Sequence, residues 1–277
     1  MQAALPFEDP EASSTPLRVV VLGSGSGGNA VVVESGASRV LVDAGFSCRE
    51  LERRMRAVGI DPASVGALLL THEHEDHVRG AGRFALRHRL PVYATRGTIA
   101  GTELPPDVVA RVELLESGTP VAVAGGAFGI EPFAIPHDAR EPVGLVIEDD
   151  RGRRVGLVAD IGCRSRLAWG RLTDLDLLLL ETNHDLEMLR SGPYPWPLKQ
   201  RVAGRHGHLS NADAGEGLPE LLCDRLRFVV LYHLSRTNNL PALAAAAVAE
   251  PLAREGSAAE IVVSDQFEPT PWLEVRT

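Results

Sequence analysis

The chain has 277 residues, of which 44% are hydrophobic and 23% are charged, and its formal net charge at pH 7 is -9. This composition is typical of a soluble globular protein, and no apolar run approaches the roughly 20 residues that a membrane-spanning helix needs. The negative charge disfavours a protein that coats nucleic acid, although bound divalent ions would make a local cleft positive.

The amino terminus and the cysteines both predict a cytoplasmic protein. Residues 1–16 contain acidic residues and no basic one, which is the wrong charge for a secretory signal, so we expect a disordered acidic tail there. Cys48, Cys163 and Cys223 are odd in number and far apart, which argues against a disulfide framework. No linker of biased composition interrupts residues 17–277, and we expect them to form a single domain.

The first predicted elements are strands on either side of a glycine-rich loop. Residues 17–23 and 30–34 are apolar and β-branched, and they enclose Ser-Gly-Ser-Gly-Gly-Asn at 24–29. The glycine spacing matches the dinucleotide fingerprint, but a strand follows where that fingerprint requires a helix. The loop is either a plain hairpin turn or a site whose backbone NH groups face an anion.

A dense group of metal-ligating side chains follows the fourth predicted strand. After a third strand at 39–42 and an amphipathic helix at 48–58, the apolar run 67–70 leads directly into Thr-His-Glu-His-Glu-Asp-His at 71–77. Donors this close suit two metal ions better than one, and the spacing excludes the zinc-protease helix. The alternative is a surface loop rich in His by chance, which the scarcity of His, 9 residues in 277, disfavours.

The same arrangement recurs farther along the chain, because His137, Asp160 and His233 each follow an apolar run. Ligands bind at the carboxyl ends of strands in open α/β sheets, so we expect these donors to meet. The remaining expected elements are helices at 79–89, 164–172 and 241–254, strands at 90–95, 175–180 and 228–232, antiparallel strands within 111–133, and a closing strand at 261–263.

The series formed by Asp43, the 72–77 cluster, His137, Asp160 and His233 resembles the metallo-β-lactamase superfamily. The resemblance implies an α/β fold, the four-layer αββα sandwich, with two divalent metal ions, Zn or Mn. It implies these metal ligands: His72, His74 and His137 for the first ion, Asp76, His77 and His233 for the second, and Asp160 for both. Asp43 matches an acid that orients ligands without binding metal.

Several other stretches resemble the bacterial YycJ/WalJ group of that superfamily, which is regarded as acting on DNA from the 5′ end. They are residues 23–29, 183–189, 194–201, 207–211 and 233–239. The resemblance implies a phosphodiesterase, a 5′-to-3′ DNA exonuclease, that attacks with water bridged between the two ions, with Asp76 or Asp160 as proton acceptor. The expected partner is DNA, single-stranded or with a free 5′ end, with RNA as a second candidate and no membrane.

Two further histidines, His184 and His208, are candidates for protonating the leaving oxygen or contacting phosphate. For His184, a metal-binding role and a purely structural role are the alternatives. Residues 194–205 combine aromatics, prolines and basic residues, as expected of a rigid loop that stacks a base and holds a phosphate. The alternative is that Trp196 and the prolines pack the loop onto the core, and the nearby basic residues favour binding. The expected substrate contacts are Ser24, Ser26, Asn29, Asn183, Trp196, Lys199, Arg201, His208 and Ser210. By contrast, Arg151, Arg153 and Arg154 are expected to form only a solvated hairpin face.

Two other functions compete with a nuclease. A small-molecule hydrolase of the same fold would cleave a thioester, a lactone or a cyclic phosphodiester, and the aromatic and basic stretch at 194–205 disfavours it. A noncatalytic scaffold would be expected to have lost ligands, and this sequence retains all of them.

Overall fold

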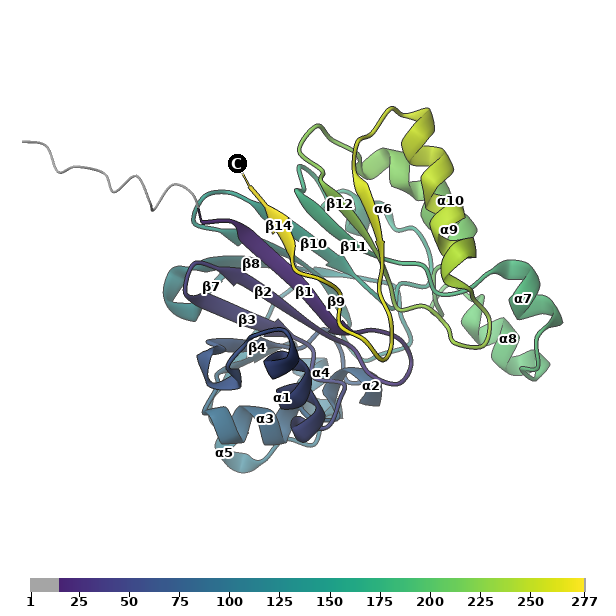
Figure 1. Cartoon of the computed structure of the whole chain (residues 1–277). Coiled ribbons are helices and arrows are strands. Elements are labelled where there is room, and N and C mark those ends of the chain that lie inside the picture. The colour runs from purple at the N-terminus through teal and green to yellow at the C-terminus, as the bar shows by residue number, and fades with distance from the viewer. Residues whose placement is uncertain (1–14, 277) are drawn as a thin grey trace, which may run out of the picture.

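The computed structural model describes residues 15–276, in which two seven-stranded sheets pack face to face and helices cover both outer faces (Figure 1). The predicted four-layer αββα sandwich is therefore confirmed. Residues 1–14 of the predicted acidic tail lie outside the described residues, and both the tail and the extent of the single domain stay predictions. Within residues 15–276, no helix is long and apolar enough to cross a membrane.

Both sheets are mixed, with antiparallel strands at one side and parallel strands at the other. The first sheet has the spatial order β14 (Leu273–Val275), β1 (Leu17–Gly23), β2 (Ala30–Ser35), β3 (Ser38–Val42), β4 (Ala67–Leu69), β5 (Val92–Ala94) and β6 (Val112–Leu114). The second has the order β13 (Glu260–Val263), β12 (Phe228–Tyr232), β11 (Leu177–Glu181), β10 (Arg154–Val158), β9 (Val143–Asp149), β8 (Phe128–Ala134) and β7 (Val121–Val123). Strands β3 to β6 are parallel to one another, as are β10 to β13.

The central strands are buried on both faces, which explains their continuous apolar sequences. In β1, Val19 and Val21 lie in the apolar core between the two sheets. Val20 and Leu22 point to the other face and pack against helices. Burying each such side chain stabilises the fold by roughly 1.5–3 kcal/mol. Because successive side chains point to opposite faces, the strand packs against the other sheet and against the helices at once.

The helices divide between the two outer faces and the edge that joins them. Helices α1 (Cys48–Ala57), α3 (Ala81–His88), α4 (Arg96–Gly101) and α5 (Pro106–Val109) pack on the first sheet. Helices α6 (Arg166–Trp169), α9 (Asn211–Gly217) and α10 (Pro241–Arg254) pack on the second. The others are α2 (Glu75–Val78), α7 (Leu186–Ser191), α8 (Trp196–Val202) and the 3-10 helices η1 (Pro62–Ser64), η2 (Ala124–Gly126) and η3 (Leu218–Leu221). In Figure 1, α7 and α8 project to one side of the second sheet.

Three expectations for the elements were wrong. Residues 112–114 form a parallel strand beside β5, so only β7 and β8 of the 111–133 region are antiparallel. The strand at 260–263 does not close the chain, because β14 follows it and pairs with β1. The predicted rigid loop at 194–205 contains helix α8, since a proline in the first helical turn gives up no intrahelical hydrogen bond.

The hairpin between β9 and β10 is only partly the solvated face that the sequence predicts, because Arg151 is exposed and Arg154 is half-buried, whereas Arg153 is buried. Arg153 is only 1% exposed, and its guanidinium lies 2.5 Å from the carboxylate of Asp149. It also donates hydrogen bonds to the carbonyl oxygens of Thr15 and Val275, at 2.8 and 3.3 Å. This buried cation therefore ties both ends of the described chain to one hairpin.

Candidate metal centre

Donor side chains gather where the carboxyl ends of the parallel strands of the two sheets meet. His72 follows β4, Asp160 follows β10 and His233 follows β12. Asp43, Asp160 and His233 have φ angles of 59°, 55° and 58°, in the left-handed region that residues other than glycine seldom adopt. Such strain persists where the surrounding structure enforces it, and it is concentrated at functional sites.

The three residues predicted to hold a first metal ion lie together. His72, His74 and His137 each offer a ligand atom within 4.8 Å of the others. Nε2 of His137 lies 3.2 Å from Nδ1 of His74, and Nε2 of His72 is buried without a hydrogen-bond partner among the described residues. Burial holds the pKa of His72 well below its usual range, which keeps the ring in the neutral form that binds metal.

The three residues predicted to hold a second ion are also together. Asp76, His77 and His233 offer ligand atoms within 4.8 Å of one another. Nε2 of His233 lies 3.3 Å from Oδ2 of Asp76. Asp160 is 2% exposed and adjoins both sets, since one oxygen is 3.0 Å from Nε2 of His77 and the other 3.8 Å from Nε2 of His137. Imidazoles and carboxylates in this arrangement fit divalent metal ions.

The ring nitrogens that face away from the centre have fixed partners. Nδ1 of His77 lies 2.7 Å from Oδ2 of Asp43, which also accepts a hydrogen bond from the hydroxyl of Thr71. Nδ1 of His137 lies 3.1 Å from the carbonyl oxygen of Gly207. Such contacts set which nitrogen is free to bind metal, so Asp43 lies where an orienting acid would act.

Glu181, for which the sequence predicts no role, is the main addition to the site. This fully buried carboxylate lies 3.1 Å from Nδ1 of His233 and 2.8 Å from Nδ1 of His208. Burial alone would lower the pKa of His208, but the charges of Glu181 and then Asp160 outweigh it, and the pKa is raised. The sequence does contain one indication of this role, because Glu181 ends the apolar strand β11, as Asp160 and His233 follow the neighbouring strands β10 and β12.

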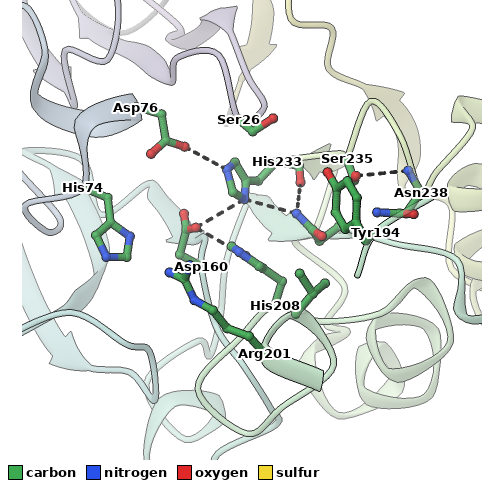
Figure 2. A pocket seen from close by; sticks show the side chains of 12 residues that line it. Ser26, His74, Asp76, Asp160, Tyr194, Arg201, His208, His233, Ser235 and Asn238 are labelled. Carbon is green, nitrogen blue, oxygen red and sulfur yellow. Dashed lines mark hydrogen bonds and ion pairs between the residues drawn. The ribbon is translucent and has the colours of Figure 1, made fainter. Parts of the chain in front are cut away.

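An open cavity of about 210 Å³ adjoins the donors (Figure 2). Of the predicted substrate contacts, Ser26, Asn183, Arg201 and His208 line it. Figure 2 shows His208 and Arg201 on one side of Asp160, with Ser26 beyond His233. The Arg201 guanidinium lies 2.6 Å from Asp138, so part of its charge is already balanced.

Other predicted substrate contacts are buried in the protein's own hydrogen bonds. The Ser24 hydroxyl accepts a hydrogen bond from the amide of His233, and the Asn29 side chain lies 3.1 Å from Nε2 of His77. The Ser210 hydroxyl caps α9 by accepting from the amide of Asp213. Because their polar atoms already have partners within the protein, the three side chains support the site in this structure, and substrate contacts through them stay a prediction.

His184, Trp196 and Lys199 lie outside this cavity. His184 is 1% exposed and belongs to neither donor set, and burial lowers its pKa to about 4, so it is a neutral interior residue. Trp196 and Lys199 line a separate apolar groove against α7. Tyr194, the other aromatic residue of the stretch predicted to stack a base, lines the metal-side cavity instead.

Comparison with known proteins places the chain in a family. A model of the beta-lactamase superfamily domain matches residues 38–234. Exodeoxyribonuclease YycJ of Bacillus anthracis is 34% identical over 87% of this chain and 90% of its own length. Exodeoxyribonuclease WalJ of Streptococcus pneumoniae serotype 2 is 35% identical over 81% of this chain and 84% of its own length.

A solved structure shows the same fold. The metallo-β-lactamase fold protein YhfI from Bacillus subtilis aligns with a TM-score of 0.68 at 18% identity, over 92% of this chain and 99% of that one. At that identity the likeness concerns the fold alone. The family model and the two relatives show the family and the group: the chain belongs to the metallo-β-lactamase superfamily, within its YycJ/WalJ group, and is a metal-dependent hydrolase.

Proposed function

We propose that this chain is a 5′-to-3′ DNA exonuclease that uses two divalent metal ions, Zn or Mn. The observation that carries the proposal is the pair of donor sets that adjoin one buried carboxylate, Asp160, in a chain whose relatives are named exodeoxyribonucleases. The proposed substrate is DNA that is single-stranded or has a free 5′ end, and RNA is a second candidate. We also propose that residues 17–277 act as one domain in the cytoplasm.

The residues divide into two metal-binding groups. His72, His74 and His137 would hold one ion, Asp76, His77 and His233 would hold the other, and Asp160 would contact both. Bound there, the ions would supply an activated water between them and positive charge for the phosphate oxygens. The imidazoles favour zinc, whereas the carboxylates and the phosphodiester chemistry also suit manganese.

The other polar residues of the cavity handle protons and orient the substrate. Asp76 or Asp160 accepts the proton of the attacking water. His208 donates a proton to the leaving oxygen, because Glu181 favours its protonated form and because His208 lines the cavity. Arg201 and Ser26 contact the phosphate backbone at the cavity rim.

The size of the cavity supports attack at a chain end. Its volume of about 210 Å³ is below the roughly 300–1,000 Å³ of sites that enclose small molecules. A cavity of this size is consistent with holding only the terminal part of a long substrate.

Digestion of end-labelled DNA tests the proposal. Protein loaded with Mn²⁺ or Zn²⁺ is given single-stranded DNA labelled at either end, with or without a 5′-phosphate, and RNA is tested in parallel. We expect stepwise release of mononucleotides from the 5′ end, which His74→Ala abolishes. His208→Ala should lower kcat by about 10²- to 10⁴-fold.

The matched control is His206→Ala, which removes an exposed histidine two residues from His208 and should leave the rate unchanged. Release from the 3′ end would refute the proposed polarity. Intact DNA and RNA, together with turnover of a thioester, a lactone or a cyclic phosphodiester, would show the small-molecule hydrolase instead.

A further inference from the structure

The side chain of Asn238 is buried, lines the cavity of the metal centre, and has no hydrogen-bond partner for either amide atom among the described residues. Buried polar groups are nearly always paired, because an unmade hydrogen bond leaves the lost hydration uncompensated. The backbone of Asn238 is well anchored, since its amide donates to the Ser235 hydroxyl and its carbonyl accepts from the amide of Asp185. The loop is therefore fixed, while the side-chain amide has no protein partner among the described residues.

The adjacent Asn239 shows what a structural asparagine looks like in this loop. Its amide nitrogen donates to the carbonyl oxygens of Thr182 and Asn183, at 2.8 and 3.0 Å. Its amide oxygen accepts from the backbone of Leu240 and the side chain of Asn211. Folding uses every polar atom of the Asn239 side chain and neither polar atom of the Asn238 side chain.

The cavity wall near Asn238 offers uncharged polar groups. The Ser235 oxygen accepts from two backbone amides, which leaves its own O–H free to donate. The Asn183 nitrogen donates to the carbonyl of His233, and Asn183 also lines the cavity. Among the described residues, Arg201 is the one arginine or lysine in the lining, and Asp138 already pairs with it. A phosphate is poorly matched to this wall, whereas a neutral group with both donors and acceptors fits it.

An aromatic ring belongs to the same wall. Tyr194 lines the cavity with Ser235 and Asn238, and Figure 2 shows these three residues on the opposite side of the view from His74 and Asp76. Aromatic side chains stack on bases of any sequence, because every base has a π face. The wall therefore combines a stacking surface with an amide that can donate and accept.

We propose that this end of the cavity is a nucleobase subsite, in which the Asn238 amide pairs with the edge of the terminal base and the Tyr194 ring stacks on its face. Asparagine pairs in this bidentate way with adjacent donor and acceptor atoms of a base. The inference rests on the proposed nuclease function and adds to it that the terminal nucleotide is held by its base. The ions then need to contact only the phosphate that is cleaved.

Substrates with and without a terminal base test the subsite in the full-length, metal-loaded protein. We compare kcat/KM for an oligonucleotide with an ordinary 5′-terminal nucleotide and for the same strand with an abasic 5′-terminal residue. The intact strand should be preferred by about tenfold or more, given stacking effects of roughly 5- to 150-fold. Asn238→Ala and Tyr194→Leu should each reduce the preference severalfold, whereas Thr237→Ala, at an exposed neighbour, should change neither rate.

A binding measurement separates failure of the subsite from failure of the proposed function. We expect dAMP to bind more tightly than deoxyribose 5-phosphate by about tenfold, and Asn238→Ala to remove most of the difference. Equal affinities, or equal losses for intact and abasic strands in the variant, would overturn the subsite. A variant effect that follows the 5′-phosphate instead of the base would identify a phosphate site and would also overturn it. Retained dAMP selectivity with no DNA cleavage would overturn the nuclease function alone.

Discussion

Nδ1 of His208 lies 2.8 Å from Oε1 of Glu181, a carboxylate with no exposed surface. The pair joins the loop before α9 to the end of β11. It also brings a cation next to Asp160, whose pKa is held well below its usual range because the charges of His233 and His77 outweigh burial. Changing Glu181 therefore probes the proton that His208 carries.

Glu181→Gln should move the alkaline limb of the pH profile of kcat/KM to lower pH. The raised pKa of His208 keeps it protonated above the usual pH range, so activity that needs this proton is lost as pH rises through that pKa. Without the carboxylate charge the pKa falls and the loss begins earlier. The profile is measured with metal content quantified at each pH, and Glu255→Gln, at an exposed acid, is the control. An unmoved limb at full metal content would rule out His208 as the donor.

Gly45→Ala should disrupt the centre although every predicted ligand remains. A Cβ at this position would lie 1.7 Å from the carbonyl oxygen of Asp76, so the start of α2 would have to move. Displacements of about 1 Å in an active site cost on the order of 10² in rate. Metal content and nuclease rate report the effect, and Gly129→Ala, where the nearest heavy atom is 4.0 Å away, should match the wild type. Full metal content and rate in Gly45→Ala would show that the turn after β3 does not set the position of α2.

His184→Gln should reduce the loss of stability in acid. The pKa of His184 is about 4 in the folded protein, below the ordinary value of 6.5 expected when unfolded, so the unfolded chain takes up the proton first. Above pH 6.5 neither state is protonated at this residue and the free energy of unfolding is unaffected by it. As pH falls from 6.5 toward 4, protonation of the unfolded chain lowers the free energy of unfolding by up to about 3 kcal/mol. Urea unfolding of metal-free protein at pH 7, 5.5 and 4.5 measures it, and the exposed His206→Gln variant should follow the wild type. Parallel pH dependences in all three proteins would contradict the buried neutral state.

Arg153→Ala should destabilise the fold by about 3–5 kcal/mol, because it leaves the buried carboxylate of Asp149 without its cation. Arg151→Ala, which truncates an exposed arginine two residues away, should change the free energy of unfolding by less than about 0.5 kcal/mol. Urea unfolding at pH 7 compares the two. Similar free energies of unfolding for both variants would show that Arg153 is solvated, as the sequence predicted, and contradict its buried ion pair.

The sequence allowed the metal-centre residues to be placed at one sheet edge because the signals are local. A continuous apolar run identifies a buried strand, and the donor follows within a few residues, as at His72 and His233. What brings such donors together is the parallel order of the strands, a general property of this kind of sheet.

The contacts that depend on distant partners were not predictable in this way. Glu181 lies beside His208 and His233 only because loops 27 and 52 residues away return to β11. Nothing local distinguishes Asn238 from Asn239, although the Asn239 amide has a partner for each polar atom and the Asn238 amide has none within residues 15–276. Helix α8 divides the 194–205 stretch, so that Arg201 lines the cavity while Trp196 lies in a separate groove.

Asp43, Asp160 and His233 have a left-handed backbone that lowers the stability of the fold, while their side chains are needed for the metal centre. Each of these conformations costs on the order of 1–3 kcal/mol for a residue other than glycine. Glycine would relieve that cost and remove the acid or imidazole at the same time. A screen of random variants for heat resistance alone would therefore enrich glycine at these three positions and discard the metal centre, so thermostable variants have to be selected for activity as well.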